Sequence, residues 1–280
     1  MIYIVRTKNG AKYGEYIANY AKELGTDCKV IPLNKIPPIK PSLHSDIFHF
    51  RTATPNKVFE KAKQLEKYGI RAINKASCLF LTSHKLFANL WAQENNIPTA
   101  KTIGSEKRHA LTIIRKMLSK HEQVILKPAT SQGQGEYCFL ITRETSEAEI
   151  ETMILETPTS ILQVQEYIPY DTLYRVIVIN NKAISEAVVY DHPSKNWKCS
   201  VCLNPQIKHL KNPPEKLLRL AEEITKVFDT EISFVDIFKA KDRFILNEIN
   251  TACNLFLHEK ATGFPIAQKI AKYLVAQSKN

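Results

Sequence analysis

The chain has 280 residues, of which 44% are hydrophobic and 24% charged, and it carries a formal net charge of +11. This composition is typical of a folded globular protein and excludes fibrous and disordered classes. No apolar run approaches the roughly 18 residues that a membrane-spanning helix needs. The opening segment MIYIVRTKNG predicts a short strand rather than a signal peptide. A cytoplasmic protein without a membrane partner is therefore expected.

The positive charge favours acidic partners such as nucleotides, acidic metabolites and acidic peptides. Lysines are scattered along the chain and form no block of five or six, so nucleic-acid binding would rest on charge alone and is disfavoured. The six cysteines are spread thinly, which favours reduced thiols over a disulfide framework. Cys199 and Cys202 form a single CxxC between His192 and His209. That spacing is uncommon for zinc, so we do not expect these four residues to form a zinc site.

Strands and helices alternate over the first part of the chain. Apolar runs predict strands at 2–6, 28–33, 46–51 and 70–74, and periodic segments predict helices at 15–25 and 55–69. The alternation predicts a small parallel α/β domain over residues 1–80.

The remainder has a different character. Helices are predicted within 83–96, 106–120, 146–157, 213–228 and 265–277, and strands within 123–129, 136–143, 161–168, 174–180, 182–190 and the hairpin 232–250. Because several strands are joined by short turns, we expect an α+β part with antiparallel sheet over 81–280.

A loop containing two of the eight glycines follows the apolar strand that ends at Lys127. Glycine lets backbone N–H groups approach phosphate oxygens closely, so Gly133, Gln134 and Gly135 could lie over a nucleotide. No helix with a GK[ST] motif follows, which excludes a Walker A loop. A long hairpin turn beside a surface lysine explains the same residues.

Three polar side chains lie within the apolar hairpin 232–250. Glu248 and Asn250 are two apart on one strand and therefore share a face, and Asp236 on the other strand could reach the same side. Unpaired carboxylates are costly in apolar surroundings, and hard Mg²⁺ prefers such oxygens. The pattern predicts a magnesium site, with a solvated sheet face as the alternative.

These motifs, taken in order, resemble the ATP-grasp superfamily and most closely the RimK-like carboxylate–amine ligases. The helix from Lys85, the loop KPATSQGQG, the hinge QEYI and the pair VDIF and NEIN follow the family's order over about residues 83–270. The resemblance implies an N-terminal α/β domain, then two α+β subdomains that clamp ATP, with a mobile lid at about 110–164. It also implies a dimer or tetramer.

The resemblance assigns roles to individual residues. Mg²⁺, or Mn²⁺ in its place, would be held by Asp236, Glu248 and Asn250. Arg175 and Lys198 would be catalytic. ATP would be bound by Lys85, Lys127, Gly133, Gln134, Gly135, Gln165, Glu166, Tyr167, Ile168 and Asp171.

This chain departs from the family pattern at two places. Asp171 lies four residues before Arg175, where the family has Asp-x-Arg, and Lys198 stands where the family has arginine. A lysine keeps the positive charge but lacks the two-pronged guanidinium. The family's glycine pair is also absent near 196–205.

The activity implied is ATP-dependent amide formation through an acyl phosphate. The substrates would be a small-molecule, peptide or protein carboxylate and an amino acid or other amine. The alternatives are an ATP-grasp phosphotransferase that acts on a hydroxyl group and a catalytically inactive nucleotide-binding protein.

Overall fold

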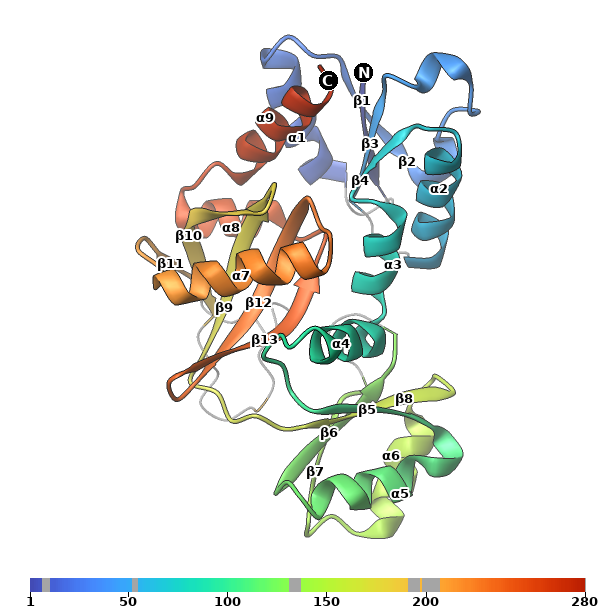
Figure 1. The fold of residues 1–280 in the computed structure, drawn as a ribbon, viewed down its shortest axis with the longest axis vertical. Helices are drawn as coiled ribbons and strands as arrows, with labels where there is room; N and C mark the ends of the chain where they lie inside the picture. The colour runs from blue at the N-terminus through green and yellow to red at the C-terminus, as the bar shows by residue number, and fades with distance from the viewer. Residues whose placement is uncertain (7–10, 52–54, 131–136, 191–196, 198–206, 280) are drawn as a thin grey trace.

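The computed structural model describes residues 1–6, 11–51, 55–130, 137–190, 197 and 207–279. Within them the chain forms three sheets (Figure 1). The first sheet lies at one end of the molecule with both chain termini, the third lies in the middle, and the second lies at the opposite end.

The first sheet is parallel and has the strand order β2-β1-β3-β4. Its strands are β1 (Ile2–Arg6), β2 (Cys28–Pro32), β3 (Ile47–Arg51) and β4 (Arg71–Ile73). The connecting helices are α1 (Ala11–Glu23) and α2 (Pro55–Lys67), with two short 3-10 turns, η2 (Leu33–Lys35) and η3 (Pro41–Leu43). The predicted parallel α/β arrangement is therefore confirmed.

The second sheet is antiparallel, in the order β5-β8-β6-β7. It consists of β5 (Thr102–Glu106), β6 (Gln123–Pro128), β7 (Phe139–Thr142) and β8 (Ile161–Glu166). The helices α5 (Lys107–Leu118) and α6 (Glu147–Glu156) cover one face, where Val124, Leu126, Leu162 and Val164 are buried. Side chains alternate along a strand, so Lys127 and Gln165 point to the other face.

The third sheet is antiparallel, in the order β11-β10-β9-β12-β13. Its strands are β9 (Thr172–Ile179), β10 (Lys182–Tyr190), β11 (Ile207–Leu210), β12 (Ile232–Ala240) and β13 (Arg243–Asn250). The helix α7 (Glu215–Val227) packs on the face that carries Val235 and Ile237. The opposite face carries Ile232 and Phe234, which share a core with the first sheet.

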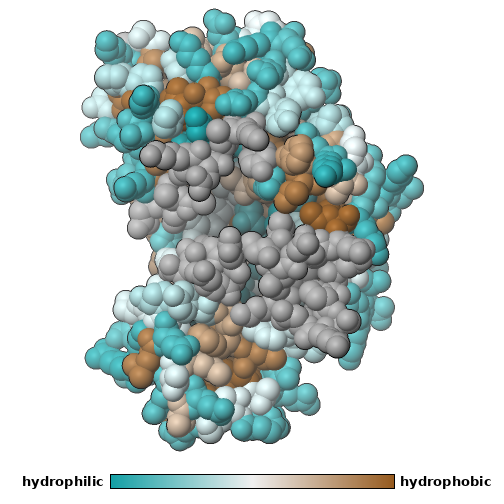
Figure 2. Space-filling view, turned by 180° about the vertical axis from the view of Figure 1, so that it is seen from behind, coloured by the Kyte–Doolittle hydropathy of each residue, from teal (hydrophilic) through white to brown (hydrophobic). Residues whose placement is uncertain are grey.

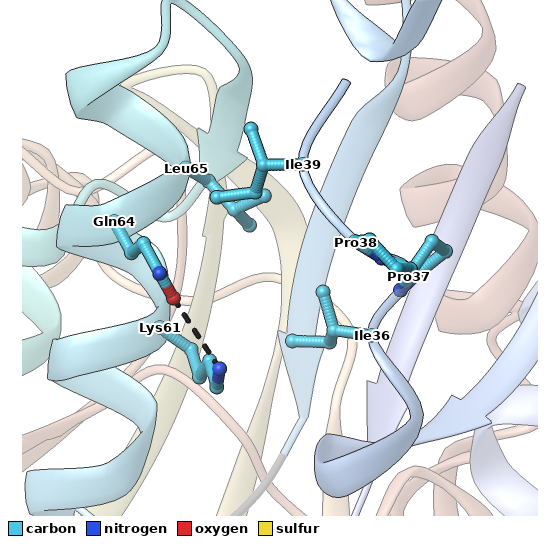
Figure 3. A pocket seen from close by; sticks show the side chains of 7 residues that line it. All are labelled: Ile36, Pro37, Pro38, Ile39, Lys61, Gln64 and Leu65. Atoms are coloured by element: carbon cyan, nitrogen blue, oxygen red, sulfur yellow. Dashed lines mark hydrogen bonds between the residues drawn. The ribbon is translucent and has the colours of Figure 1, made fainter.

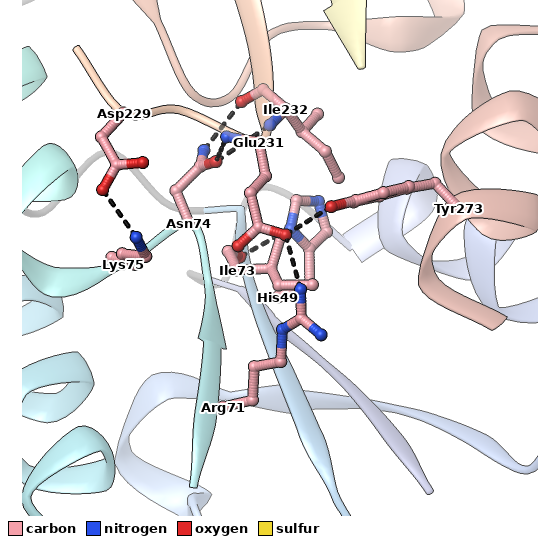
Figure 4. A network of polar contacts seen from close by, with 9 residues as sticks. All are labelled: His49, Arg71, Ile73, Asn74, Lys75, Asp229, Glu231, Ile232 and Tyr273. Carbon is pink, nitrogen blue, oxygen red and sulfur yellow. Dashed lines mark hydrogen bonds and ion pairs between the residues drawn. The ribbon is translucent and has the colours of Figure 1, made fainter. Parts of the chain in front are cut away.

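The first and third sheets are joined by apolar and polar contacts. The helix α9 (Ile266–Gln277) packs with α1 in the shared core. The buried side chain of Asn74 forms hydrogen bonds with the backbone at the start of β12. Its Oδ1 accepts from the backbone N–H groups of Glu231 and Ile232 at 2.7 and 2.9 Å (Figure 4). Around it, Arg71 donates to Glu231 at 3.0 Å.

Some elements differ from the sequence-based prediction. The residues before Lys85 form a separate helix, α3 (Ala76–Ser83), and only then does α4 (Lys85–Glu94) begin. A further helix, α8 (Leu255–Thr262), follows the hairpin. The predicted strand at 136–143 is shorter, because β7 contains only Phe139–Thr142. Both α3 and α8 are short and have weak apolar periodicity, which explains why the pattern did not indicate them.

None of the helices in the described part of the chain has the length and apolar character that a bilayer crossing requires. Most of the residues coloured in Figure 2 are hydrophilic, and the hydrophobic ones gather in separate patches.

Candidate functional site

The hairpin β12–β13 brings the three predicted metal ligands together. Asp236 is directly opposite Glu248 in the register, and Phe234 is opposite Asn250. Directly opposed residues share a face of the sheet, and Asn250 Nδ2 lies 3.5 Å from Asp236 Oδ2. Asp236 is only 4% exposed, so the alternative of a solvated sheet face is wrong for this residue.

Asp236 is bound by an arginine from the neighbouring strand. Arg175 on β9 is its register partner. Arg175 Nε donates to Asp236 Oδ1 and Nη2 donates to Oδ2, both at 2.6 Å. Burial works against a charged guanidinium, but the Asp236 carboxylate raises the pKa of Arg175 well above its usual range. Burial raises the pKa of Asp236, against the lowering effect of Arg175. The two-pronged contact fixes the Asp236 carboxyl group in one orientation.

Two residues that the sequence analysis did not assign to the site lie behind this pair. His258 Nδ1 is 2.6 Å from the carbonyl of Asn254, so it carries the proton and donates. Its Nε2 is then an acceptor, 2.6 Å from the Tyr190 hydroxyl and 3.3 Å from Arg175 Nη1. Burial and the charge of Arg175 lower the pKa of His258 to about 4. The neutral His258 thus accepts hydrogen bonds from the Tyr190 hydroxyl and from Arg175.

Lys85, at the start of α4, contacts one of the predicted metal ligands. It is the first residue of α4, which lies between the second and third sheets (Figure 1). Its Nζ is 3.7 Å from Glu248 Oε1. The Glu248 carboxylate raises the pKa of Lys85, against the lowering effect of burial. The helix start and the hairpin therefore meet at one place.

Lys127 has no such carboxylate contact in the described residues. Its Nζ donates to Gln165 Oε1 at 2.7 Å. Burial, together with the charge of Lys85, lowers the pKa of Lys127 to about 8. A buried ammonium group whose described hydrogen-bond partner is a neutral amide favours an anionic ligand.

Gln165 is held by two further side chains that the sequence analysis did not single out. Its Nε2 donates to Asn89 Oδ1 at 3.2 Å and to Thr102 Oγ1 at 3.0 Å. Asn89 lies on α4, one turn after Lys85, and its Nδ2 donates to the Lys85 carbonyl at 2.8 Å. A network of neutral side chains thus fixes Lys127 relative to the start of α4.

The predicted adenine hinge is largely occupied by protein contacts. The backbone N–H groups of Glu166 and Tyr167 donate to the carbonyls of Lys101 and Gln123. The Glu166 carboxylate accepts from the backbone N–H of Lys101 at 2.8 Å and lies 3.0 Å from His121 Nδ1.

The two residues predicted beyond the hinge lie in the segment that follows β8. Ile168 is half-buried there. Asp171 Oδ2 accepts from the backbone N–H of Lys241 at 3.1 Å, next to the β12–β13 turn. The roles of the hinge residues and Asp171 in binding adenine and ribose stay predictions.

Four predicted residues lie outside the described residues: Gly133, Gln134, Gly135 and Lys198. The CxxC of Cys199 and Cys202 and the nearby His192 also lie outside them, whereas His209 pairs with Glu186. Among the described residues, no group of three His, Cys, Asp or Glu side chains could hold a metal.

Comparison with known proteins decides the family. A family model for the RimK-like ATP-grasp domain matches residues 80–274. The chain belongs to the RimK-like ATP-grasp family. The predicted family and fold class are thereby confirmed, and membership supports ATP-dependent ligase chemistry in general. No curated protein matched the chain.

Several solved structures have a similar fold over nearly the whole length of this chain. The ligase PsnB complexed with minimal precursor, Mg and ADP has a TM-score of 0.75 at 13% identity, covering 100% of this chain and 98% of its own. The macrocyclase MdnC from Microcystis aeruginosa, bound with precursor peptide MdnA, has a TM-score of 0.73 at 13% identity, covering 99% and 100%. D-alanyl-alanine synthetase A from Vibrio cholerae has a TM-score of 0.71 at 16% identity, covering 100% and 99%.

The donor set fits a magnesium ion in an ATP-grasp site. Mg²⁺ prefers one or two carboxylates, with its remaining positions filled by water and phosphate oxygens. Glu248 keeps about a third of its side chain exposed, and Asn250 adds a neutral amide oxygen beside it. Asp236 Oδ1 accepts one hydrogen bond from Arg175 and has a second lone pair left, whereas Oδ2 accepts from Arg175 and from Asn250 Nδ2.

A pocket elsewhere does not belong to this site. It lies in the first part of the chain between α2 and the segment after η2, where Ile39 lies beside Leu65 (Figure 3). Its described polar contact joins Lys61 and Gln64 at 3.3 Å. None of the predicted site residues that the structure describes lines it.

Proposed function

We propose that this protein is an ATP- and Mg²⁺-dependent ligase that joins a carboxylate to an amine through an acyl phosphate. The observation that carries the proposal is the contact between Lys85 and Glu248. It brings a predicted phosphate-binding cation next to a predicted metal ligand, with Lys127 held close by through Gln165.

The first half of the reaction forms the acyl phosphate. A carboxylate oxygen of the acid substrate attacks the γ-phosphorus of ATP, the bond to the bridging oxygen breaks, and ADP leaves. Lys85 and Lys127 would hold the phosphates, and Lys198 would lie beside the transferring group. Asp236, Glu248 and Asn250 would hold Mg²⁺ or Mn²⁺, which when bound neutralises charge on the phosphate oxygens.

The second half forms the amide. The amine nitrogen attacks the acyl carbon, the carbon–oxygen bond to phosphate breaks, and inorganic phosphate leaves as the nitrogen loses a proton. Positive charge near the acyl group stabilises the tetrahedral transition state. The geometry of Arg175 supports an indirect part in both halves, because its described contacts orient Asp236.

The substrates we propose are a peptide, protein or small-molecule carboxylate and an amino acid or other amine. The solved relatives support this class: two are bound with precursor peptides, and one is a D-alanyl-alanine synthetase. The net charge of +11 suits an acidic substrate.

The test is a screen of carboxylates against amines with Mg-ATP, in which ADP, inorganic phosphate and product mass are all measured. Inorganic phosphate is expected only when both a carboxylate and an amine are present, with a product lighter by one water than their sum. A phosphotransferase would form ADP with a hydroxyl acceptor and retain the phosphate on it. An inactive nucleotide-binding protein would bind ATP without forming ADP.

A further inference from the structure

We propose that the carboxyl edge of the first sheet, between β1 and β3, is an anion site in which Arg51 and Arg6 bind a carboxylate of a substrate that does not itself react. The inference rests on the proposed ligase function, to which it adds a substrate requirement. It concerns residues that the sequence analysis did not single out.

The strand order places this edge at a switch point. In the order β2-β1-β3-β4, the chain leaves β1 toward β2 on one side and leaves β3 toward β4 on the other. In open parallel sheets, ligands bind outside the carboxyl ends of the strands at such a point. β1 and β3 end at Arg6 and Arg51.

These two arginines are neighbours. Arg6 is paired with Arg51 in the parallel register, as Ile4 is with His49 and Ile2 with Ile47. Residues in register share a face, and Ile2, Ile4 and Ile47 lie in the core shared with the third sheet. Arg6 and Arg51 therefore lie on the face of the first sheet that is turned toward the third sheet and the metal ligands.

Arg51 is buried and has no ionic partner among the described residues. It is 6% exposed. Its Nη2 donates to the carbonyl of Cys253 at 2.6 Å, while Nη1 has no hydrogen-bond partner in the described part of the chain. Burial lowers the pKa of Arg51, whereas the carboxylate of Asp236 raises that of Arg175. A buried cation in this condition is destabilising unless an anion joins it.

The position relative to the proposed reaction centre fits a substrate. Cys253 follows Asn250 by three residues, and its Sγ lies 3.9 Å from His258 Nδ1. Its carbonyl meets Arg51, while His258 meets Arg175. A substrate held by Arg51 would thus lie beside the end of β13, close to the three metal ligands.

The other cationic side chains of the described site already have partners or suit the nucleotide. Lys85 is matched by Glu248 and Arg175 by Asp236. Lys127, with its neutral partner Gln165, suits the phosphates of ATP. Arg51 comes from a different sheet, so the carboxylate would be a second anion that binds separately from the nucleotide.

The carboxylate could belong to the acid substrate or to the amine substrate, and the experiment separates these sources. Binding to the full-length protein would be measured by calorimetry in the presence of Mg²⁺ and a non-hydrolysable ATP analogue. In one arm, N-acetylglutamate is compared with each of its two monoamides. In the other, alanine and glutamate are compared with their α-carboxamides.

In one of the two arms, the wild type is expected to bind the amide roughly 10- to 100-fold more weakly than the carboxylate, as for the loss of a charged hydrogen bond. Arg51→Met should abolish this discrimination, and Arg51→Lys should restore part of it. Affinity for the ATP analogue should be unchanged in both variants.

Thermal unfolding supplies the structural control. Arg51→Met should be at least as stable as the wild type, because an incompletely paired buried cation is removed. The matched variant Arg71→Met, which breaks a described ion pair with Glu231, should be less stable. A stability loss in Arg51→Met with intact discrimination would show that Arg51 only ties the two sheets together and would overturn the proposal.

The outcome separates this site from the proposed function. Carboxylate discrimination that depends on Arg51 without any ADP formation would leave the anion site standing and remove the ligase proposal. ADP and amide formation without such discrimination would support the ligase proposal and overturn the anion site. If no carboxylate probe binds the wild type, the anion site is wrong.

Discussion

Arg175 and Asp236 face each other across β9 and β12, and two hydrogen bonds of 2.6 Å join the guanidinium to both oxygens of the carboxylate. The resemblance to the family implies a catalytic role for Arg175 and a metal-binding role for Asp236. The structure joins the two side chains, so that each determines the position of the other.

Removing the arginine should therefore affect stability as well as chemistry. Arg175→Met leaves the 4%-exposed Asp236 without its partner, and we expect a loss of about 3–5 kcal/mol in the free energy of unfolding. The double variant Arg175→Met/Asp236→Leu should recover much of that loss, because no uncompensated charge is left. Urea unfolding measures both. Equal stability of Arg175→Met and the wild type would rule out a structural role for the pair.

Two glutamines on one strand offer a matched comparison. Gln163 and Gln165 are both buried on the same face of β8. The side chain of Gln165 forms hydrogen bonds with Lys127, Asn89 and Thr102, whereas neither polar atom of the Gln163 side chain has a partner among the described residues. Gln165→Leu should lower the free energy of unfolding by about 1–3 kcal/mol and weaken ATP binding. Gln163→Leu should be neutral or stabilising, and a similar loss in both variants would contradict the network.

We expect Lys127 to make nucleotide binding sensitive to pH. Its folded-state pKa is about 8, lowered by burial and by Lys85, and phosphate binding requires the protonated form. ATP affinity should therefore be highest below pH 8 and fall as the pH rises above it, by up to about tenfold per unit. Lys127→Arg, which stays protonated, should lose this dependence while retaining binding. A wild-type affinity that is constant between pH 7 and 9 would exclude contact between Lys127 and the phosphates.

The same lowered pKa has a consequence for folding. Between pH 8 and about 10.5, the unfolded chain binds the Lys127 proton and the folded chain does not, so the contribution of Lys127 to stability becomes more favourable as the pH rises. Below pH 8 both states are protonated, and burial of the charge is destabilising.

Glu248 is the predicted metal ligand with the most solvent access among the carboxylates. Glu248→Gln removes its charge, and the concentration of Mg²⁺ needed for half-maximal ADP formation should rise by about tenfold or more. Glu215→Gln on the exposed face of α7 removes a carboxylate away from the site and should leave the Mg²⁺ dependence unchanged. If the two variants behave alike, Glu248 does not hold the metal.

The parts of the fold that sequence could predict are those with strong periodicity. The alternating strands and helices before residue 74 indicated a parallel sheet, and the Asp236, Glu248 and Asn250 spacing indicated one face of a hairpin. The register adds that Asp236 and Glu248 are directly opposed. The helices α3 and α8 were missed because each is only 8 residues long and has little apolar periodicity.

The residues that support the site could not be found from local pattern. The sequence analysis did not assign His258 to the site, because nothing near it in sequence indicates that Tyr190 and Arg175 approach it in space. Asn89 is an ordinary polar residue on an amphipathic helix until Gln165 is placed against it. Arg51 ends a strand as many charged residues do, and only its burial and its place beside Arg6 indicate a ligand. The domain boundary at 80, the mobile lid at about 110–164 and the oligomeric state stay predictions.

We propose that this ATP-grasp protein activates a carboxylate for attack by an amine. The most direct measurement is release of inorganic phosphate from Mg-ATP with carboxylate alone, amine alone and both together, with the product identified by mass. We expect phosphate release and an amide product only with both substrates, and loss of both signals in Glu248→Gln at limiting Mg²⁺. Transfer of phosphate to a hydroxyl acceptor, or release that does not depend on an amine, would contradict it.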